Sequence, residues 1–287
     1  MSLIALCRFQ FRDDQSRTSR AGIVVSDSIH VLPESMTGDL ALTSILDAGS
    51  PIDRATELVS HCEQQVSLIS PEIRFLSPLE RQEVWGTGMT YHKAVDPHSQ
   101  NLSLYEKAYL SDRPFFFYKS SAHVTAGSGG IIRVRPDSFN TIAEPELTVV
   151  LSSTGKIAGY TIGSDVTARD IEGENPLYQC LSKCYDGSCS VGPWIRLCSY
   201  SDLRNSVVRT RQVRGSEVIF RGETNLGQMV KTPETIAEWF LRGGQRPLGA
   251  AILTGNGVAF PADITLQAGD VVTHEIEGLG VQSATVA

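Results

Sequence analysis

The sequence predicts an α+β protein that is mostly β, in which a small N-terminal α/β domain precedes a larger strand-rich domain. Two segments with helical spacing of apolar residues lie between residues 39 and 67. Beyond them, short stretches of alternating polar and apolar residues are separated by frequent glycine-containing turns. The few later helix signals are not interleaved with the strands, which excludes a doubly wound parallel sheet.

Residues 1–77 contain the elements of the small domain. Residues 3–11 and 21–32 are predicted strands on either side of the polar loop "RDDQSRTSRAG". Residues 39–48 and 52–67 carry Leu, Ile, Ala and Val at helical spacing around "GSP", so we expect two helices there. Two Ser-Pro dipeptides in "SPEIRFLSPLERQEV" place the boundary near residue 77, which leaves residues 78–287 for the second domain.

The second domain is expected to hold two helices among its strands. One helix covers about residues 101–111, and the other begins at Thr232-Pro233, where a capping residue precedes a proline, and ends at Gly243-Gly244. The turn "SSTGK" connects "AEPELTVV" to "IAGYTIGSDVTARD" and predicts a hairpin. The tail "ITLQAGDVVTHEIEGLGVQSATV" alternates and turns at "AGD" and "GLG", as successive strands do.

Composition excludes several classes of protein. The chain of 287 residues is 41% apolar and 20% charged, which is typical of a globular protein. Its net charge of −7 and scattered basic residues argue against a nucleic-acid partner. Only five apolar residues stand in a row before Arg8, and no later run approaches membrane-spanning length, so we expect no membrane partner and a cytoplasmic location.

Four of the six cysteines crowd into a C-x3-C-x4-C-x8-C pattern at Cys180, Cys184, Cys189 and Cys198. Structural zinc sites usually combine a tight pair with a distant second pair, which this spacing fits poorly. In a cytoplasmic protein these residues are expected to be reduced thiols.

Glu144 and Glu146 begin a strand and share one of its faces. The predicted hairpin brings Asp165 of the return strand within reach of this pair. Three carboxylates offer the oxygen ligands that Mg²⁺, Mn²⁺ or Ca²⁺ prefer, and they leave positions open for a substrate. The alternative is a solvated strand face for the glutamates and an ordinary turn residue for the aspartate.

A polar stretch, "RDIEGENPLYQCLSKCYDGSCSVGPWI", follows Asp165 and is expected to be a loop that lines a site. Lys183 is its candidate catalytic residue, because a lysine stabilises an enolate or acts as a base. Candidates for holding substrate hydroxyls are Arg169, Asp170, Glu174 and Asn175. A solvated lysine and loop-fixing side chains are the alternatives.

Taken in order, these motifs resemble the fumarylacetoacetate hydrolase superfamily. The resemblance rests on "GMTY" (88–91), "FYK" (117–119), the E-x-E strand, "GYTIGSDVTARD", Lys183, "VGPW" and the C-terminal "ILTGNGVAF…LQAGDVV". It implies a mixed β roll over about residues 80–280 and a divalent ion held by Glu144, Glu146 and Asp165.

The resemblance also implies a small-molecule 2-oxo acid or β-dicarbonyl substrate near Lys183, and a homo-oligomer, either a dimer or a tetramer. Lys119 of the "FYK" motif is then a substrate-binding candidate. Thr254, beside Gly255 and Gly257, is expected to bind the substrate carboxylate or to shape a turn.

Branch-specific motifs favour a dehydratase. Carbon–carbon hydrolases of this kind carry N-Y-x-x-H-x-x-E, whereas "TYHKAVDP" places Ala94 and Pro97 at the His and Glu positions and displaces His92 by two residues. The runs "TARDIEGENPLY" and "RPFFFYK" are similar to the 2-keto-3-deoxy-D-arabinonate dehydratase branch. Phe115 stands where that branch has a glutamate, and "QCL" replaces its usual "LPQ".

The expected reaction is therefore a metal-dependent β-elimination of the C4 hydroxyl from a 2-keto-3-deoxy sugar acid, with Lys183 handling a proton or stabilising an enolate. One rival is a hydrolase or decarboxylase of acylpyruvate or oxaloacetate-type acids. The other is a non-catalytic, metal-stabilised β domain that binds a partner.

Overall fold

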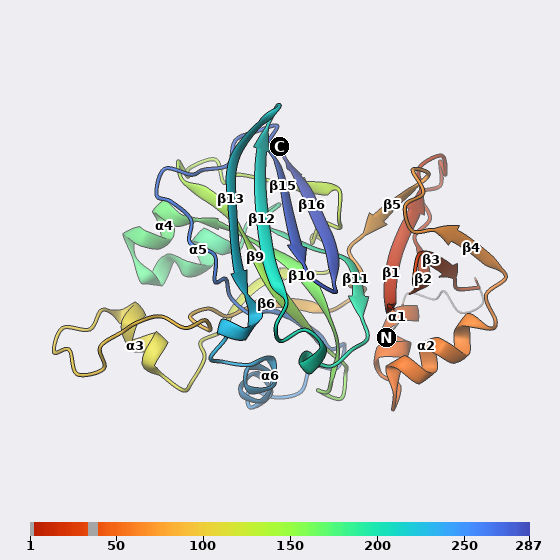
Figure 1. Cartoon of the computed structure of the whole chain (residues 1–287), viewed down its shortest axis with the longest axis horizontal. Coiled ribbons are helices and arrows are strands. Elements are labelled where there is room, and N and C mark those ends of the chain that lie inside the picture. Colours follow the sequence, from red (N-terminus) through yellow and green to blue (C-terminus); the bar gives the residue numbers. More distant parts are fainter. Residues whose placement is uncertain (1–2, 34–39) are drawn as a thin grey trace.

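The computed structural model describes residues 3–33 and 40–287 and confirms an α+β fold that is mostly β (Figure 1). Two sheets form its framework. The larger has eleven strands in the order β4-β3-β2-β1-β11-β10-β9-β14-β6-β7, with β5 paired to β1 outside this path. The smaller has the order β13-β12-β15-β16-β8.

The strands of the larger sheet are β1 (Ile4–Phe11), β2 (Arg20–Val25), β3 (Ser28–Val31), β4 (Gln64–Ser67), β5 (Ile73–Leu76), β6 (Glu83–Gly86), β7 (Phe117–Ser121), β9 (Thr141–Leu151), β10 (Ile157–Ala168), β11 (Cys189–Arg196) and β14 (Ala250–Leu253). Those of the smaller sheet are β8 (Gly130–Ile132), β12 (Val207–Arg214), β13 (Glu217–Asn225), β15 (Val271–Ile276) and β16 (Gly280–Val286). The predicted strands of the tail are thereby confirmed.

The N-terminal elements lie together at one side of the molecule (Figure 1). The predicted strand 21–32 is in fact the hairpin β2–β3, because Ser26 adopts a positive φ of 52° and reverses the chain. Helix α1 (Ala41–Leu46) lies within the predicted 39–48, whose first residue falls outside the described part. Helix α2 (Pro51–Val59) is shorter than predicted, since residues 64–67 pair with β3 as β4.

The large sheet continues from the N-terminal elements into the rest of the chain. Strand β1 pairs with β11 in antiparallel register, with Cys7 opposite Trp194. Backbone hydrogen bonds therefore cross the sequence boundary near residue 77. The division into residues 1–77 and 78–287 stays a prediction about folding units.

Four α-helices follow residue 77: α3 (Leu104–Leu110), α4 (Arg169–Glu174), α5 (Gln179–Lys183) and α6 (Pro233–Leu241). Helices α3 and α6 match the predicted positions, and the Thr232 side chain caps α6 by accepting the Thr235 N–H at 3.3 Å. The stretch after Asp165 was expected to be a loop, which is wrong. It forms α4, a short 3₁₀ turn (Pro176–Tyr178) and α5 before entering β11.

Both faces of the central β9–β10 hairpin are buried. Leu147 and Val149 of β9 share a core cluster with Val208 and Ile276 of the smaller sheet. Because successive strand residues point to opposite faces, Glu144 and Glu146 lie on the other face of β9, where Val150 joins the core under α1 and α2. The E-x-E pair is therefore not on a solvated face. In the described part of the chain, no helix is long and apolar enough to span a membrane.

Candidate metal centre and active site

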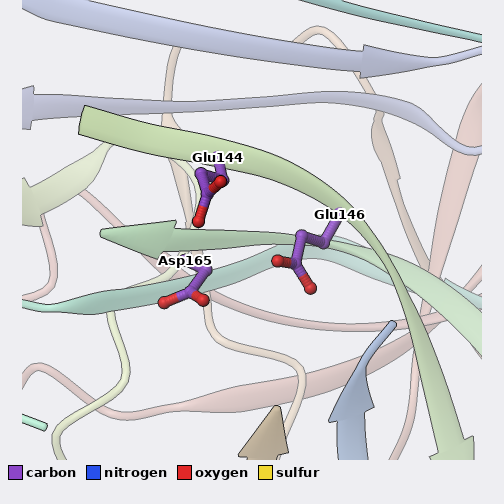
Figure 2. Close-up of side chains that lie close together, drawn as sticks. All are labelled: Glu144, Glu146 and Asp165. Carbon is purple, nitrogen blue, oxygen red and sulfur yellow. The ribbon is translucent and has the colours of Figure 1, made fainter. Parts of the chain in front are cut away.

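Strand pairing assembles the acidic triad. Asp165 of β10 is directly opposite Glu144 of β9, and Gly163 is opposite Glu146. Directly opposed residues share a face of the sheet, so the three carboxylates converge, with ligand oxygens within 4.8 Å of one another (Figure 2). The predicted three residues thus form one cluster.

Neighbouring groups orient the two glutamates. The Glu144 carboxylate accepts hydrogen bonds from Thr167 Oγ1 at 3.0 Å and from Asn256 Nδ2 at 3.2 Å. Glu146 Oε2 accepts the Gly255 N–H at 2.6 Å. Gly255 is required there because its φ is +91° and a Cβ atom would lie 2.5 Å from Thr90 Oγ1.

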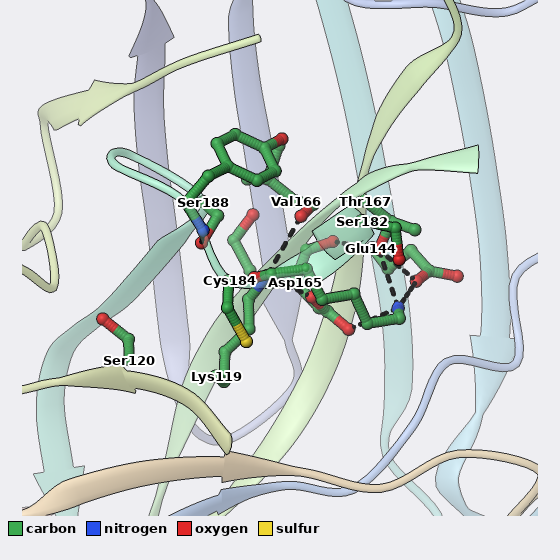
Figure 3. Close-up of polar contacts among 12 residues, drawn as sticks. Lys119, Ser120, Glu144, Asp165, Val166, Thr167, Ser182, Cys184 and Ser188 are labelled. Atoms are coloured by element: carbon green, nitrogen blue, oxygen red, sulfur yellow. Dashed lines mark hydrogen bonds and ion pairs between the residues drawn. The ribbon is translucent and has the colours of Figure 1, made fainter. Parts of the chain in front are cut away.

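Two buried lysines, Lys119 and Lys183, contact the triad, and Figure 3 shows the polar contacts around Glu144, Asp165 and Lys119. Lys183 Nζ lies 2.8 Å from Asp165 Oδ2, 3.2 Å from Glu144 Oε2 and 2.8 Å from Thr167 Oγ1. Lys119 Nζ lies 2.6 Å from Asp165 Oδ1 and donates to the carbonyls of Val166 at 3.0 Å and of Lys183 at 2.5 Å. Lys119 therefore holds both Asp165 and the backbone of Lys183.

Burial and charge set the protonation states. Burial alone would lower the pKa of Lys183, but the carboxylates of Asp165, Glu144 and Glu172 outweigh it and raise that pKa well above its usual value. Burial alone would raise the pKa of Asp165, but the two lysines hold it below the usual value. For Glu146, burial and then the Asp165 and Glu144 charges raise the pKa well above its usual value.

The residues present fit a divalent cation. Lys119 approaches Asp165 Oδ1 closely but not in hydrogen-bond geometry, and among the described residues this buried oxygen has no hydrogen-bond partner. The carboxylates of the site are those of Glu144, Glu146, Asp165 and Glu172, and its ammonium groups are those of Lys119 and Lys183. When all six groups are ionised, two negative charges are not balanced by a lysine. Oxygen ligands with this charge suit Mg²⁺, Mn²⁺ or Ca²⁺.

A cavity of about 190 Å³ opens onto the triad and Lys183. It is lined by Thr87, Gly88, Met89, Tyr105, Tyr109, Phe115, Phe117, Glu144, Glu146, Asp165, Glu172, Gln179, Lys183, Gly255 and Asn256. A larger hollow of about 720 Å³ lies over β12, β13 and β15, where arginine and glutamate side chains pair with each other. Convergent carboxylates and lysines, rather than volume, distinguish the smaller cavity as the candidate active site.

None of the six predicted substrate-binding side chains lines this cavity, and Lys119 is fully buried against Asp165. Arg169 donates to Asn140 Oδ1 at 2.8 Å and to the backbone carbonyls of residues 260–264. Asp170 accepts from Ser138 Oγ at 2.6 Å, and Asn175 caps the following 3₁₀ turn.

Glu174 is exposed, and Thr254 Oγ1 donates to the Leu147 carbonyl at 2.8 Å. The five side chains of Arg169, Asp170, Glu174, Asn175 and Thr254 therefore anchor or border the site. Their contact with a substrate stays a prediction.

Sequence reasoning gave no role to Glu172, Asn256, Tyr105 or Tyr109, all of which line the cavity. Glu172 lies one turn after Arg169 in α4, and helical spacing within "RDIEGEN" was the available signal. Asn256 lies between Gly255 and Gly257, where close backbone approach was the signal. The two tyrosines belong to α3, and nothing local in the sequence points them at the triad.

Residues 83–287 match the family model for the fumarylacetoacetate (FAA) hydrolase C-terminal domain. The chain belongs to the fumarylacetoacetate hydrolase family. It is 37% identical over 219 residues, 73% of each chain, to 2-dehydro-3-deoxy-D-arabinonate dehydratase from Saccharolobus solfataricus. It is 34% identical over 253 residues, 87% of each chain, to a probable 2-keto-3-deoxyxylonate dehydratase from Haloferax volcanii.

A solved structure gives a similar result for the fold. The 2-keto-3-deoxy-D-arabinonate dehydratase complexed with magnesium and 2,5-dioxopentanoate superposes with a TM-score of 0.80 at 31% identity and covers 98% of both chains. The predicted family resemblance is thereby confirmed.

Two features specialise this member of the fumarylacetoacetate hydrolase family. Among the described residues that line the cavity none is a histidine, and His92 is exposed outside it. Phe115 contributes an apolar wall and stacks on Phe117 at 6.3 Å between ring centroids. The site therefore offers carboxylates, an ammonium group and phenols for proton transfer, but no imidazole.

Proposed function

We propose that this protein is a divalent-metal-dependent dehydratase that removes water by β-elimination from a 2-keto-3-deoxy sugar acid, such as 2-keto-3-deoxy-D-arabinonate. The observation that carries the proposal is the Lys183 ammonium group, which contacts Glu144 and Asp165 of the acidic triad and lines the same cavity as they do. The two dehydratase relatives and the magnesium and dioxo-acid complex of a similar fold support the same reaction class.

The size of the cavity also suits a small substrate. Its volume of about 190 Å³ is smaller than the roughly 300–1,000 Å³ of pockets for drug-sized ligands. Its lining combines charged groups at the triad and Lys183 with the aromatic side chains of Tyr105, Tyr109, Phe115 and Phe117. A short acid with one strongly polar end fits this distribution.

Glu144, Glu146 and Asp165 would hold the ion, for which we propose Mg²⁺, with Mn²⁺ or Ca²⁺ as alternatives. The bound ion would supply Lewis-acid polarisation of a 2-oxo acid and so increase the acidity of its C3 protons. Asn256 and Thr167 orient Glu144 for this role, and Gly255 orients Glu146.

Lys183 is proposed as the catalytic residue. Its ammonium group offers a positive charge and hydrogen-bond donors beside the position where an enolate develops, and such preorganised charge lowers the barrier to proton abstraction. Lys119, which holds Asp165 and the Lys183 carbonyl, is proposed to fix this geometry and to contact the substrate end of the cavity. Arg169, Asp170, Glu174, Asn175 and Thr254 remain proposed as surrounding substrate contacts.

The first experiment uses metal-stripped protein with a panel of 2-keto-3-deoxy pentonates, 2-keto-3-deoxy hexonates and acylpyruvates, with and without Mg²⁺. Loss of water is detected as a decrease of one H₂O in product mass. We expect metal-dependent dehydration that Glu146→Gln or Lys183→Met abolishes, while Glu217→Gln, an exposed site at the start of β13, leaves it unchanged.

Two other results would reject the proposal. Cleavage of acylpyruvate without dehydration would assign the hydrolase or decarboxylase reading, with an unrecognised group activating water. Mg²⁺ binding without turnover of any panel member, and without stabilisation by any 2-oxo acid, would assign the non-catalytic metal-stabilised domain.

We also propose a cytoplasmic location and a homo-oligomer, either a dimer or a tetramer. All six cysteines are free thiols, which fits a reducing compartment. Helix α3 buries none of its residues in the single chain, and Leu104 and Leu110 are 62% and 42% exposed, which fits contact with a second copy. Light scattering of the purified chain gives its mass in solution.

A further inference from the structure

Glu172 is the one carboxylate lining the described cavity that does not belong to the acidic triad. It projects from α4, whose first residue, Arg169, is anchored to Asn140 Oδ1 and to the carbonyl of Ile264, both at 2.8 Å. Tyr105 of α3 donates a hydrogen bond to the backbone carbonyl of Glu172 at 3.4 Å. Two independent contacts therefore hold the backbone that presents this side chain.

Lys183 lies between Glu172 and the triad. Its Nζ atom is 3.9 Å from Glu172 Oε1 and 3.2 Å from Glu144 Oε2. Both distances are measured from Lys183 Nζ, so Glu172 Oε1 and Glu144 Oε2 lie no farther apart than these two distances, 3.9 and 3.2 Å, added together. Glu172 therefore lies within reach of a small substrate whose oxo-acid end is held at the triad.

The Glu172 carboxylate is available for chemistry. Its distance to Lys183 Nζ is too long for a hydrogen bond, and within residues 3–33 and 40–287 no other group donates to this carboxylate. Its side chain is 25% exposed, so it exchanges protons with solvent. Burial, supported by the Glu144 and Asp165 charges and opposed by Lys183, raises the pKa of Glu172 above its usual value.

Other cavity groups are less suited to donate a proton at this end. The side chains of Phe115 and Phe117 have no acidic proton, and the Tyr105 hydroxyl already donates a hydrogen bond to the Glu172 backbone carbonyl. Tyr109 has a pKa that burial and Glu144 raise above the usual value, which makes its phenol a weaker acid. Lys183 is bonded to two carboxylates and a threonine hydroxyl.

We propose that Glu172 is the catalytic acid that protonates the departing C4 hydroxyl. This role rests on the proposed dehydratase function. In the expulsion step, the electron pair of the enolate re-forms the C2 carbonyl, the former C2–C3 π electrons form the C3–C4 double bond, and the C4–O bond breaks. The Glu172 proton joins the departing oxygen, so that water leaves and Glu172 becomes a carboxylate, which regains a proton from solvent. Adjacent carbons are about 1.5 Å apart, so C4 lies within a few ångströms of C2, a span compatible with the separation of Glu172 from the triad.

The test compares Glu172→Gln with the wild-type enzyme in two assays, each with Mg²⁺ and the panel substrate that dehydrates fastest. Release of water measures the whole reaction, and incorporation of deuterium at C3 from D₂O measures enolisation alone. We expect Glu172→Gln to slow dehydration by roughly 100-fold or more, the usual contribution of a general acid, while C3 exchange stays within about threefold of wild type.

A 4-fluoro-4-deoxy substrate supplies a second, independent readout. Fluoride departs without needing a proton, so elimination of fluoride should be nearly as fast in Glu172→Gln as in wild type. A residue with a purely structural role would not restore activity in this leaving-group-dependent way. Glu217→Gln serves as the matched control, and the melting temperature of each variant reports folding.

The outcomes separate the two proposals. Wild-type dehydration with an unimpaired Glu172→Gln variant would overturn the role of Glu172 and leave the dehydratase function intact. Equal loss of C3 exchange, dehydration and fluoride elimination in a folded Glu172→Gln variant would also overturn it, since Glu172 would then act in binding or enolisation. Failure of the wild-type enzyme to dehydrate any 2-keto-3-deoxy acid would overturn the proposed function and, with it, the acid role.

Discussion

Glu146 and Asp165 belong to the same triad, yet neutralising them should change the stability of the metal-free protein in opposite directions. Burial and two neighbouring carboxylates raise the pKa of Glu146, and no lysine lies in contact with it among the described residues. Asp165 is contacted by two lysines, Lys119 and Lys183. Glu146→Gln therefore removes repulsion, whereas Asp165→Asn leaves two buried ammonium groups poorly compensated.

The magnitudes follow from these distances. Two unit charges 4.8 Å apart repel by about 3 kcal/mol at an effective dielectric constant of about 20. The raised pKa of Glu146 lowers the charge that it carries, and glutamine weakens the bond from Gly255, so we expect a smaller gain of about 1–2 kcal/mol. Removing one partner of a buried ion pair costs about 3–5 kcal/mol. At roughly 2–4 °C per kcal/mol for a chain of this size, Glu146→Gln should melt about 5 °C higher and Asp165→Asn about 10 °C lower.

Differential scanning calorimetry with EDTA, and then with Mg²⁺, checks the prediction. Because folding raises the pKa of Glu146, the stability linked to this group is present at low pH and is lost as pH rises through the folded-state value. The gain from Glu146→Gln should therefore grow as pH rises above about 4.5, the ordinary pKa of a glutamate. Mg²⁺ at about 100 times its dissociation constant should stabilise the wild-type protein by about 2.7 kcal/mol. The same Mg²⁺ concentration should stabilise Glu146→Gln and Asp165→Asn much less, because each variant lacks one ligand. A metal-free Glu146→Gln protein that melts below wild type would refute the reasoning.

Three further predictions concern the scaffold. Arg169→Met should lower the free energy of unfolding by about 2–3 kcal/mol, because it removes the hydrogen bonds to Asn140 and to the carbonyls of Phe260 and Ile264. As a proposed substrate contact, Arg169 should also raise KM when it is replaced, and an unchanged KM in steady-state kinetics would contradict that contact. Gly255→Ala should weaken Mg²⁺ affinity in calorimetric titration, because a Cβ atom 2.5 Å from Thr90 Oγ1 displaces the N–H that holds Glu146; unchanged affinity would contradict this. Burial lowers the pKa of His274 to about 3, below the unfolded value, so stability present above about pH 6.5 should be lost toward pH 3 by about 1.4 kcal/mol per pH unit. Urea unfolding of wild type and His274→Gln measures that difference, and equal slopes for the two proteins would contradict it.

Much of the site was predictable because it is built from one hairpin. The two-residue periodicity of a strand places Glu144 and Glu146 on one face, and the turn "SSTGK" returns the chain beside them. A shift of one residue in the register between Ile157 and Gly159 then brings Asp165 opposite Glu144. Helix α6 was likewise predictable, since Thr232 and Pro233 are local signals for a helix start. In each case the determining contacts lie within about 25 residues of sequence.

Prediction failed where a short segment took its conformation from distant partners. Residues 64–67 carry helical spacing but pair with β3, and the polar run after Asp165 forms α4 and α5. The hydrogen bonds from Arg169 to backbone carbonyls about ninety residues away were likewise not predictable, because nothing local in the sequence indicates these partners. Tertiary hydrogen bonds outweigh the small local preferences of such segments.

The sequence by itself determined the triad, the position of Lys183 after it and the family that these motifs indicate. Only the tertiary structure decided that Glu172, Asn256 and the two tyrosines of α3 face the same cavity, and that one sheet joins the N-terminal strands to β11. The physical reason is that strand periodicity fixes the direction of a side chain within its own element. Which groups meet it across a cavity depends on the packing of elements far apart in the chain, where burial and charge compensation rather than local spacing select the arrangement.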